Sequence, residues 1–385
     1  MKPEVNYAGS DAHSASAQAA AGTIKIVRPE PIIKADNLAY ILFNKVDLKL
    51  QKQFLTDFGM VIAEQSSDAI YMRGTGTLPY FYVAYDRQKT NLKKEKKGYM
   101  GIGFSVESEA ELQKLSKATS TSIEPVDGPG GGKRVRLIDP DGFIVDVVWG
   151  RKAVERLPSR TEIPAINTPF EKKRVNQGVR TPLQPSALER LGHCVLSVSN
   201  YKKSLDWYMT HVGLIATDVL CLEDGTPTLS FNRLDRGKTP TDHHSFVLLQ
   251  NLAPQYMHSA YETIDLDSVG QGQQYLTWKG WKHFWGMGRH TLGSQIFDYW
   301  LDPEGDELEH YADGDVFDDS YVTRYHLMDI GGTWAWGDDV PKAMRTTSLK
   351  QVWLVVKALK SGMLSKQVLV MIKKALSMPA RPWLK

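Results

Sequence analysis

The pattern of LGHCVLSVSNYKKSLDWYMTHVG, residues 191–213, recurs in LAYILFNKVDLKLQKQFLTDFG, residues 38–59, and this recurrence is the main clue to the fold. In each copy a short apolar strand pattern leads to a helix-capping residue nine positions after the first Leu, Asn200 or Asp47. An aromatic-rich amphipathic helix follows and ends at a glycine. The sequence therefore predicts that the chain is duplicated, with a strand and a helix opening each half.

A second pair of segments supports the duplication. LIDPDGFIVDVVW, residues 137–149, parallels WLDPEGDELEHYA, residues 300–312, and in both a hairpin-type turn leads into a strand. Between the halves, residues 151–190 are Pro-rich, charged and short of strand signals, which is typical of a linker. We therefore predict an N-terminal domain over residues 32–150 and a C-terminal domain over residues 191–342.

The two ends of the chain lie outside this repeat. Residues 1–31 are rich in Ala, Ser and Gly and are predicted to form a disordered leader. Residues 343–385 contain LKQVWLVVKALKSGMLSKQVLVMIKKALSM, a basic amphipathic helical pattern. We expect this extension to pack on the protein or to form a homo-oligomer contact; peripheral contact with a membrane surface is the alternative.

The composition narrows the class of protein. With 47 basic and 44 acidic residues the formal net charge is only +3, so no overall field favours binding to nucleic acid. Two cysteines, Cys194 and Cys221, cannot form a disulfide framework and suit a reducing compartment. No uncharged apolar run is long enough for a transmembrane helix. We expect a cytoplasmic protein.

Histidine is distributed unequally between the two copies. Nine of the ten histidines fall between residues 193 and 326, and none lies between His13 and His193. Alignment of the copies places Tyr40 opposite His193 and Asp146 opposite Glu309. Since imidazole is a favoured ligand for transition metals, a metal site is expected only in the second copy.

The motifs of the second copy resemble those of a known family. They are LGH at residues 191–193, DHHSFVLL at 242–249, GRHT at 288–291 and DELEHYADG at 306–314. Together with the repeat they resemble the type I extradiol (catechol meta-cleaving) dioxygenases of the vicinal oxygen chelate superfamily. The resemblance implies an α+β fold of two tandem domains, each made of paired βαβββ modules that form an open barrel, with Fe(2+) held in the C-terminal domain.

The resemblance also implies three metal ligands, His193, His244 and Glu309. Alternation along a strand does not choose between His243 and His244; the family pattern favours His244 and leaves His243 as a supporting or surface residue. Two histidines and one carboxylate on one side of a metal leave positions open for a catecholate and for O2.

Two further residues match the family by their spacing. In the family a His in GRHT is followed nine residues later by a Tyr and, after ten more, by the Glu ligand; His290, Tyr299 and Glu309 keep both intervals. The resemblance therefore implies that His290 and Tyr299 are catalytic residues beside the substrate and O2. It implies no further cofactor.

One departure from the family concerns proton transfer. Many members carry an acid-base His roughly fifteen residues before the second metal ligand, but that interval counted back from His244 reaches Leu229, and residues 214–242 contain no histidine. His290, Asp242 or Tyr299 is expected to serve instead.

These observations predict Fe(II)-dependent extradiol cleavage of an aromatic vicinal diol with O2. One alternative is a metal-dependent isomerase or lyase of the glyoxalase kind, which binds two substrate oxygens without using O2. Another is a non-catalytic relative that binds aromatic ligands. His290 and Tyr299 favour the oxygenase, because a reaction without O2 has less need of hydrogen-bond donors on the side of the metal where O2 would bind. The three predicted metal ligands argue against a pure binding protein.

Overall fold

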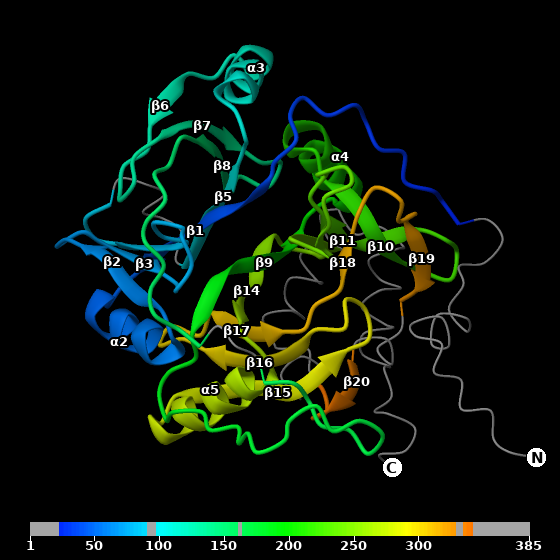
Figure 1. Cartoon of the computed structure of the whole chain (residues 1–385). Coiled ribbons are helices and arrows are strands. Elements are labelled where there is room, and N and C mark those ends of the chain that lie inside the picture. The colour runs from blue at the N-terminus through cyan, green and yellow to red at the C-terminus, as the bar shows by residue number, and fades with distance from the viewer. Residues whose placement is uncertain (1–22, 91–97, 161–163, 329–333, 342–385) are drawn as a thin grey trace, which may run out of the picture.

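The computed structural model describes residues 23–90, 98–160, 164–328 and 334–341, which form two strand-rich domains (Figure 1). The N-terminal domain contains β1 (Asn37–Lys45), α2 (Leu48–Phe58), β2 (Val61–Gln65), β3 (Ala69–Arg73), β4 (Tyr82–Asp86), β5 (Gly98–Ser105), α3 (Glu109–Thr119), β6 (Ile123–Pro125), β7 (Lys133–Ile138) and β8 (Ile144–Trp149).

The C-terminal domain repeats this order. Its main elements are β9 (Leu188–Val198), α4 (Tyr201–Val212), β10 (Ile215–Cys221), β11 (Pro227–Arg233), β13 (Phe246–Gln250), β14 (Gln255–Thr263), α5 (Leu266–Trp278), β15 (Lys282–His290), β16 (Ile296–Leu301) and β17 (Glu307–Ala312). Four short strands are added: β12 (Thr241–Asp242), β18 (Val316–Phe317), β19 (Arg324–Leu327) and β20 (Trp334–Gly337).

One strand-helix-strand-strand-strand unit accounts for this architecture. The first and last strands of each unit pair in parallel, as in β1 with β4, β5 with β8, β9 with β13 and β14 with β17. The two units of a domain join through their first strands, which are antiparallel in β1–β5 and β9–β14. The predicted fold class, α+β with two tandem domains of paired βαβββ modules, is confirmed.

The repeated caps form as the sequence predicts. The side chains of Asp47 and Asn200 accept hydrogen bonds from backbone N–H groups in the first turns of α2 and α4. Gly59 and Gly213 end these helices with φ of 115° and 76°. A Cβ atom on Gly59 would lie only 2.0 Å from the backbone oxygen of Ser186, so this helix end also needs glycine for space.

The repeated turns connect the two domains in a reciprocal way. The backbone N–H of Ser199 donates to Oδ2 of Asp141 at 3.1 Å, and that of Val46 donates to Oε1 of Glu304 at 2.6 Å. Both donors immediately precede a helix-capping residue, and both acceptors lie in the duplicated turn. The two halves therefore pack with approximate twofold symmetry.

Buried contacts support the same interface. Tyr99 and Tyr256, which occupy equivalent positions on β5 and β14, stack with ring centroids 5.4 Å apart. The Lys45 ammonium, fully buried, forms an ion pair with Asp302 and lies 2.6 Å from Oδ2 of Asp306. Burial of this lysine is tolerated because both carboxylates reach it from the other domain.

The boundaries differ from prediction at two places. Residues 23–31, predicted as part of a disordered leader, lie against the C-terminal domain: the backbone N–H of Ile26 donates to the Tyr325 hydroxyl, and Arg28 pairs with Asp235 at 2.9 Å. β9 begins at Leu188, inside the predicted linker. The predicted extension over residues 343–385 lies outside the described residues. No helix in the described ranges has the length and apolarity needed to cross a membrane.

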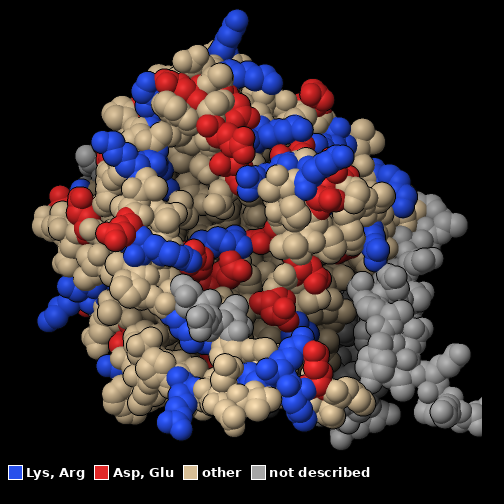
Figure 2. All heavy atoms as spheres, in the orientation of Figure 1, with Lys and Arg blue, Asp and Glu red and all other residues tan. Residues whose placement is uncertain are grey.

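Figure 2 shows Lys and Arg interspersed with Asp and Glu on the face drawn there. This mixture agrees with the formal net charge of +3. A surface that mixes positive and negative charges does not attract a polyanion such as nucleic acid as a uniformly positive surface would. That the chain binds no nucleic acid stays a prediction.

Candidate metal centre and active site

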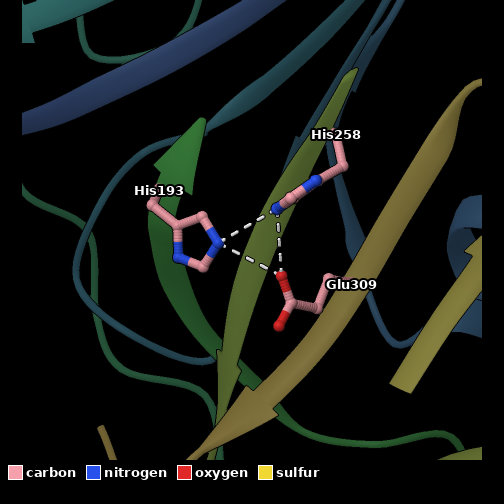
Figure 3. A group of neighbouring side chains, drawn as sticks. All are labelled: His193, His258 and Glu309. Atoms are coloured by element: carbon pink, nitrogen blue, oxygen red, sulfur yellow. Dashed lines mark hydrogen bonds and ion pairs between the residues drawn. The ribbon is translucent and has the colours of Figure 1, made fainter. Parts of the chain in front are cut away.

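Three adjacent strands bring three metal-ligating side chains to one face of the C-terminal sheet (Figure 3). They are His193 on β9, His258 on β14 and Glu309 on β17. Ala260 on β14 pairs with His193 on one side and with Glu309 on the other. Because side chains alternate along a strand, His258, two residues before Ala260, projects to the same face.

The ligand atoms lie at the separations that one metal ion requires. Nε2 of His193 lies 3.1 Å from Oε2 of Glu309 and 3.3 Å from Nε2 of His258, which in turn lies 3.3 Å from the same oxygen. Two atoms bonded to one ion at about 2.1 Å in perpendicular directions lie about 3 Å apart. The group therefore matches one triangular face of an octahedron, the arrangement of the two-histidine, one-carboxylate site.

The electrostatics of the group also fit a cation. Burial opposes ionisation of Glu309, yet the neighbouring His193 and His258 hold the pKa of its carboxyl well below the ordinary value. Burial lowers the pKa of His193, which keeps this imidazole neutral and able to bind a metal. Oε1 of Glu309 is buried without a hydrogen-bond partner in the described structure. A bound cation would compensate this buried carboxylate.

The structure gathers two of the three predicted ligands, but His258 and not His244 completes the group. His244 immediately precedes β13, which pairs with β9 on the side opposite β14. Its ring centroid lies 4.3 Å from that of His193, and its Nδ1 lies 2.8 Å from Nδ1 of His243. His244 therefore lies beside the group of potential ligands and outside it.

A signal in the sequence could have found His258. The two antiparallel first strands of the second units read GYMGIGFS at residues 98–105 and QYMHSAYET at 255–263. Aligned on the shared Tyr-Met, they place Gly101 opposite His258. His244 also precedes His258 by fourteen residues, close to the interval that the family keeps between its acid-base histidine and its second ligand.

His290 and Tyr299 lie at the edge of the same group. Nε2 of His290 is 3.0 Å from the Tyr299 hydroxyl and 3.8 Å from Oε1 of Glu309. Tyr299 pairs with Glu309 across β16 and β17, and its ring meets that of His258 edge to face at 5.0 Å. Burial, and then the charge of Glu309, raise the pKa of Tyr299 well above its ordinary value, so its hydroxyl keeps the proton that it can donate.

The equivalent positions of the N-terminal domain are filled differently. Gly103 on β5 pairs with both Tyr40 and Asp146, as Ala260 pairs with two ligands in the other domain. The Tyr40 hydroxyl donates to Oδ2 of Asp146 at 2.8 Å, and Arg136 donates to both of its oxygens at 2.7 Å. The Arg136 guanidinium supplies the positive charge that the buried carboxylate requires.

This N-terminal network lacks imidazole ligands, and Gly101 stands where His258 lies in the other copy. Within the described ranges, His193, His258 and Glu309 are the one group of this kind able to hold a metal. That the N-terminal copy binds no metal stays a prediction, which this network supports.

Comparisons with known proteins agree with the fold. No family model matches the chain. Metapyrocatechase 2 from Cupriavidus necator is 28% identical over 307 residues, which cover 77% of this chain and 87% of that enzyme. Homoprotocatechuate 2,3-dioxygenase from Brevibacterium fuscum, solved as an anaerobic complex with 3,4-dihydroxyphenylacetate, has a TM-score of 0.65 at 19% identity, covering 82% of this chain and 93% of that one.

A Mn(II)-bound glyoxalase from Novosphingobium aromaticivorans shares the fold equally well. Its TM-score is 0.65 at 19% identity, covering 82% of this chain and 95% of that one. The resemblance to extradiol dioxygenases of the vicinal oxygen chelate superfamily is confirmed by the homologues and by the fold. The fold by itself does not separate the dioxygenase from the glyoxalase reaction.

Proposed function

We propose that this chain is a Fe(II)-dependent extradiol dioxygenase that opens an aromatic vicinal diol beside its two hydroxyl groups, with O2 as the second substrate. The observation that carries the proposal is the convergence of His193, His258 and Glu309 on one sheet face, with His244 and the His290–Tyr299 pair around it. The names of the homologues support extradiol cleavage of a catechol.

We assign the metal to His193, His258 and Glu309, so that His258 replaces His244 as the second imidazole ligand. Fe(II) held there would present open positions to both diol oxygens and to O2, and would allow electron transfer between them. The chain's own contribution is a buried, rigid set of ligands. Glu309 and His193 are almost completely shielded from solvent, and each lies on a strand paired on both sides.

We assign acid-base catalysis to His244, in place of His290, Asp242 or Tyr299, which the sequence suggested for this role. Burial, and then the neighbouring histidines His193, His243, His290 and His258, lower its pKa well below the ordinary value. At neutral pH His244 is therefore an uncharged base. Beside His193 it is placed to accept a proton from a diol hydroxyl that reaches the metal.

Tyr299 and His290 act as donors on the opposite side of the group. The Tyr299 phenol, which stays protonated, can donate to a diol oxygen and so favour the substrate monoanion. His290 hydrogen-bonds to Tyr299 and reaches towards Glu309, and we assign it to the side of the group on which O2 would bind. Neither residue belongs to the group of three metal ligands.

The experiment is O2 uptake by the full chain, loaded anaerobically with Fe(II), across a panel of catechol, methylcatechols, 2,3-dihydroxybiphenyl and homoprotocatechuate. One O2 consumed per diol, with a yellow ring-cleaved product, is the expected result. Resorcinol is the matched control, because its hydroxyls are not adjacent and cannot chelate one metal. Absence of O2 uptake with every adjacent diol would refute the proposal.

A metal-dependent isomerase or lyase of the glyoxalase kind is the second candidate, favoured by the shared fold of the Mn(II)-bound glyoxalase. Turnover of a hemithioacetal, the adduct of a thiol and an aldehyde, under nitrogen would identify that reaction, with Mn(II) restoring the activity of the metal-free chain. Adding either Fe(II) or Mn(II) to the metal-free chain and measuring turnover distinguishes the two as the activating ion.

Two general properties complete the proposal. We place the enzyme in the cytoplasm, since Cys194 and Cys221 are buried free thiols, which suit a reducing compartment. We also propose a homo-oligomer, which light scattering of the full chain would test.

A further inference from the structure

Four buried side chains form a hydrogen-bonded chain that leads away from the proposed acid-base residue. Nδ1 of His244 lies 2.8 Å from Nδ1 of His243, whose Nε2 lies 2.6 Å from Oδ2 of Asp218. The other oxygen of Asp218 is 2.8 Å from Nε2 of His326. All four residues are between 1% and 6% exposed, so water does not compete for these hydrogen bonds.

The surrounding structure fixes the ring of His243. It lies between the rings of Phe231 and Phe317, at centroid distances of 5.3 and 5.7 Å. Its backbone N–H donates to the carbonyl oxygen of Asp315 at 2.8 Å. A Cβ atom on Gly293 would lie 2.9 Å from Nδ1 of His243, so a glycine lets this loop close over the histidine pair.

The order of donors and acceptors along this chain follows from Asp218. Burial would raise the pKa of this carboxyl, but the hydrogen bonds that it accepts from His243 and His326 lower it to about 2. Asp218 is therefore ionised at neutral pH and can only accept. His243 must donate to it through Nε2–H, which in the neutral imidazole leaves Nδ1 as an acceptor. His244 must then donate through Nδ1–H.

We propose that Asp218 and His243 are positioning residues that fix the tautomer and orientation of His244, leaving its Nε2 as a lone pair directed away from His243. His326 holds the second oxygen of Asp218 and so fixes the carboxylate. The catalytic meaning of this arrangement rests on the proposed function. When the diol O–H bond breaks, the proton forms an Nε2–H bond on His244, and the resulting imidazolium stays hydrogen-bonded through Nδ1–H to His243.

The arrangement follows the logic of a catalytic triad, in which a buried aspartate sets the tautomer of a histidine base. Here a second imidazole lies between the aspartate and the base. The aspartate can therefore remain outside the substrate site and still decide which nitrogen of His244 accepts a proton.

Nitrogen-15 NMR of the full, metal-free chain with labelled histidine tests the tautomers without any catalytic assay. The expected result is a proton on Nδ1 of His244 and on Nε2 of His243. Asp218→Asn should reverse both, because an amide can donate to Nε2 of His243. A wild-type His244 protonated on Nε2, or a His243 carrying both protons at neutral pH, would overturn the proposal.

Two substitutions of His243 provide a matched activity test. In His243→Asn the amide oxygen can occupy the position of Nδ1 and accept from His244, whereas His243→Gln keeps a donor for Asp218 and leaves no acceptor beside His244. We expect kcat to stay within about threefold of wild type in the Asn variant and to fall about tenfold or more in the Gln variant. Equal losses of kcat in both variants would indicate a merely structural role and contradict the proposal.

These two measurements separate this proposal from the proposed function. If no adjacent diol is cleaved but the tautomers are as expected, the function fails and the positioning of His244 stands. If diols are cleaved and His244 carries its proton on Nε2, the positioning proposal fails and the function stands.

Discussion

Oε2 of Glu309 lies 3.1 Å from Nε2 of His193, although 116 residues separate them in the sequence. A single strand, β14, joins them, because Ala260 pairs with both residues. The register of β14 therefore decides which side chain completes the group, and it selects His258.

The first prediction separates the proposed ligand from the proposed base. His258→Ala should lose most of the bound iron, because it removes one of three ligands. His244→Ala should keep the iron and lower kcat about a hundredfold, within the range usual for one acid-base group. Iron per chain by elemental analysis and kcat on the same preparations measure both effects. Loss of iron from His244→Ala, with retention in His258→Ala, would restore His244 as the ligand.

A second prediction concerns the pair beside the substrate. Tyr299→Phe and His290→Ala should each leave iron bound and reduce turnover by roughly ten- to a thousandfold, as expected for one donor or acid-base group. Glu309→Ala is the contrasting variant, which should lose the metal itself. Full O2-dependent ring cleavage by both Tyr299→Phe and His290→Ala would show that this pair is not catalytic.

A substitution in the N-terminal counterpart of the site should lower the stability of the fold and leave the metal content unchanged. Asp146 is fully buried and pairs with Arg136 through two hydrogen bonds, so Asp146→Ala leaves an uncompensated guanidinium. We expect a loss of about 3–5 kcal/mol in the free energy of unfolding, by analogy with other broken buried ion pairs. Iron should remain at one per chain. Denaturant unfolding measures the loss of stability, and metal analysis measures the iron per chain. If the wild type held two irons and the substitution removed one of them, the purely structural role of Asp146 would be refuted.

Acid should weaken the fold partly through Asp218. Its pKa is lowered in the folded chain from the ordinary value of 3.8 to about 2, so its ionised form stabilises the fold above pH 3.8. This contribution, about 2 kcal/mol, is lost as the pH falls from about 3.8 towards 2. Urea unfolding of the metal-free chain at pH 5 and pH 3 should show a steeper loss in wild type than in Asp218→Asn. Identical pH dependence in the two proteins would contradict this origin.

The amino-acid sequence predicted the duplication, both helix caps and, through the family resemblance, the grouping of His290, Tyr299 and Glu309. These features depend on neighbours along the chain: Asn200 caps the turn that follows it, and the duplicated turns precede their strands directly. The interval from His290 to Tyr299 is spanned by one hairpin, so local pairing of β15 with β16 is sufficient to bring them together.

The choice between His244 and His258 depends on long-range strand pairing. His244 precedes β13 and His258 lies on β14, and both strands pair with β9. Each histidine could face His193 in one of two registers, since a shift of one residue turns a side chain to the other face of the sheet. The pairing of Ala260 with residues on two other strands fixes that register, and such long-range pairing leaves no local trace in the chain. For the same reason the sequence could not show that Asp218 and His326, from β10 and β19, meet His243, or that residues 23–31 pack against the C-terminal domain.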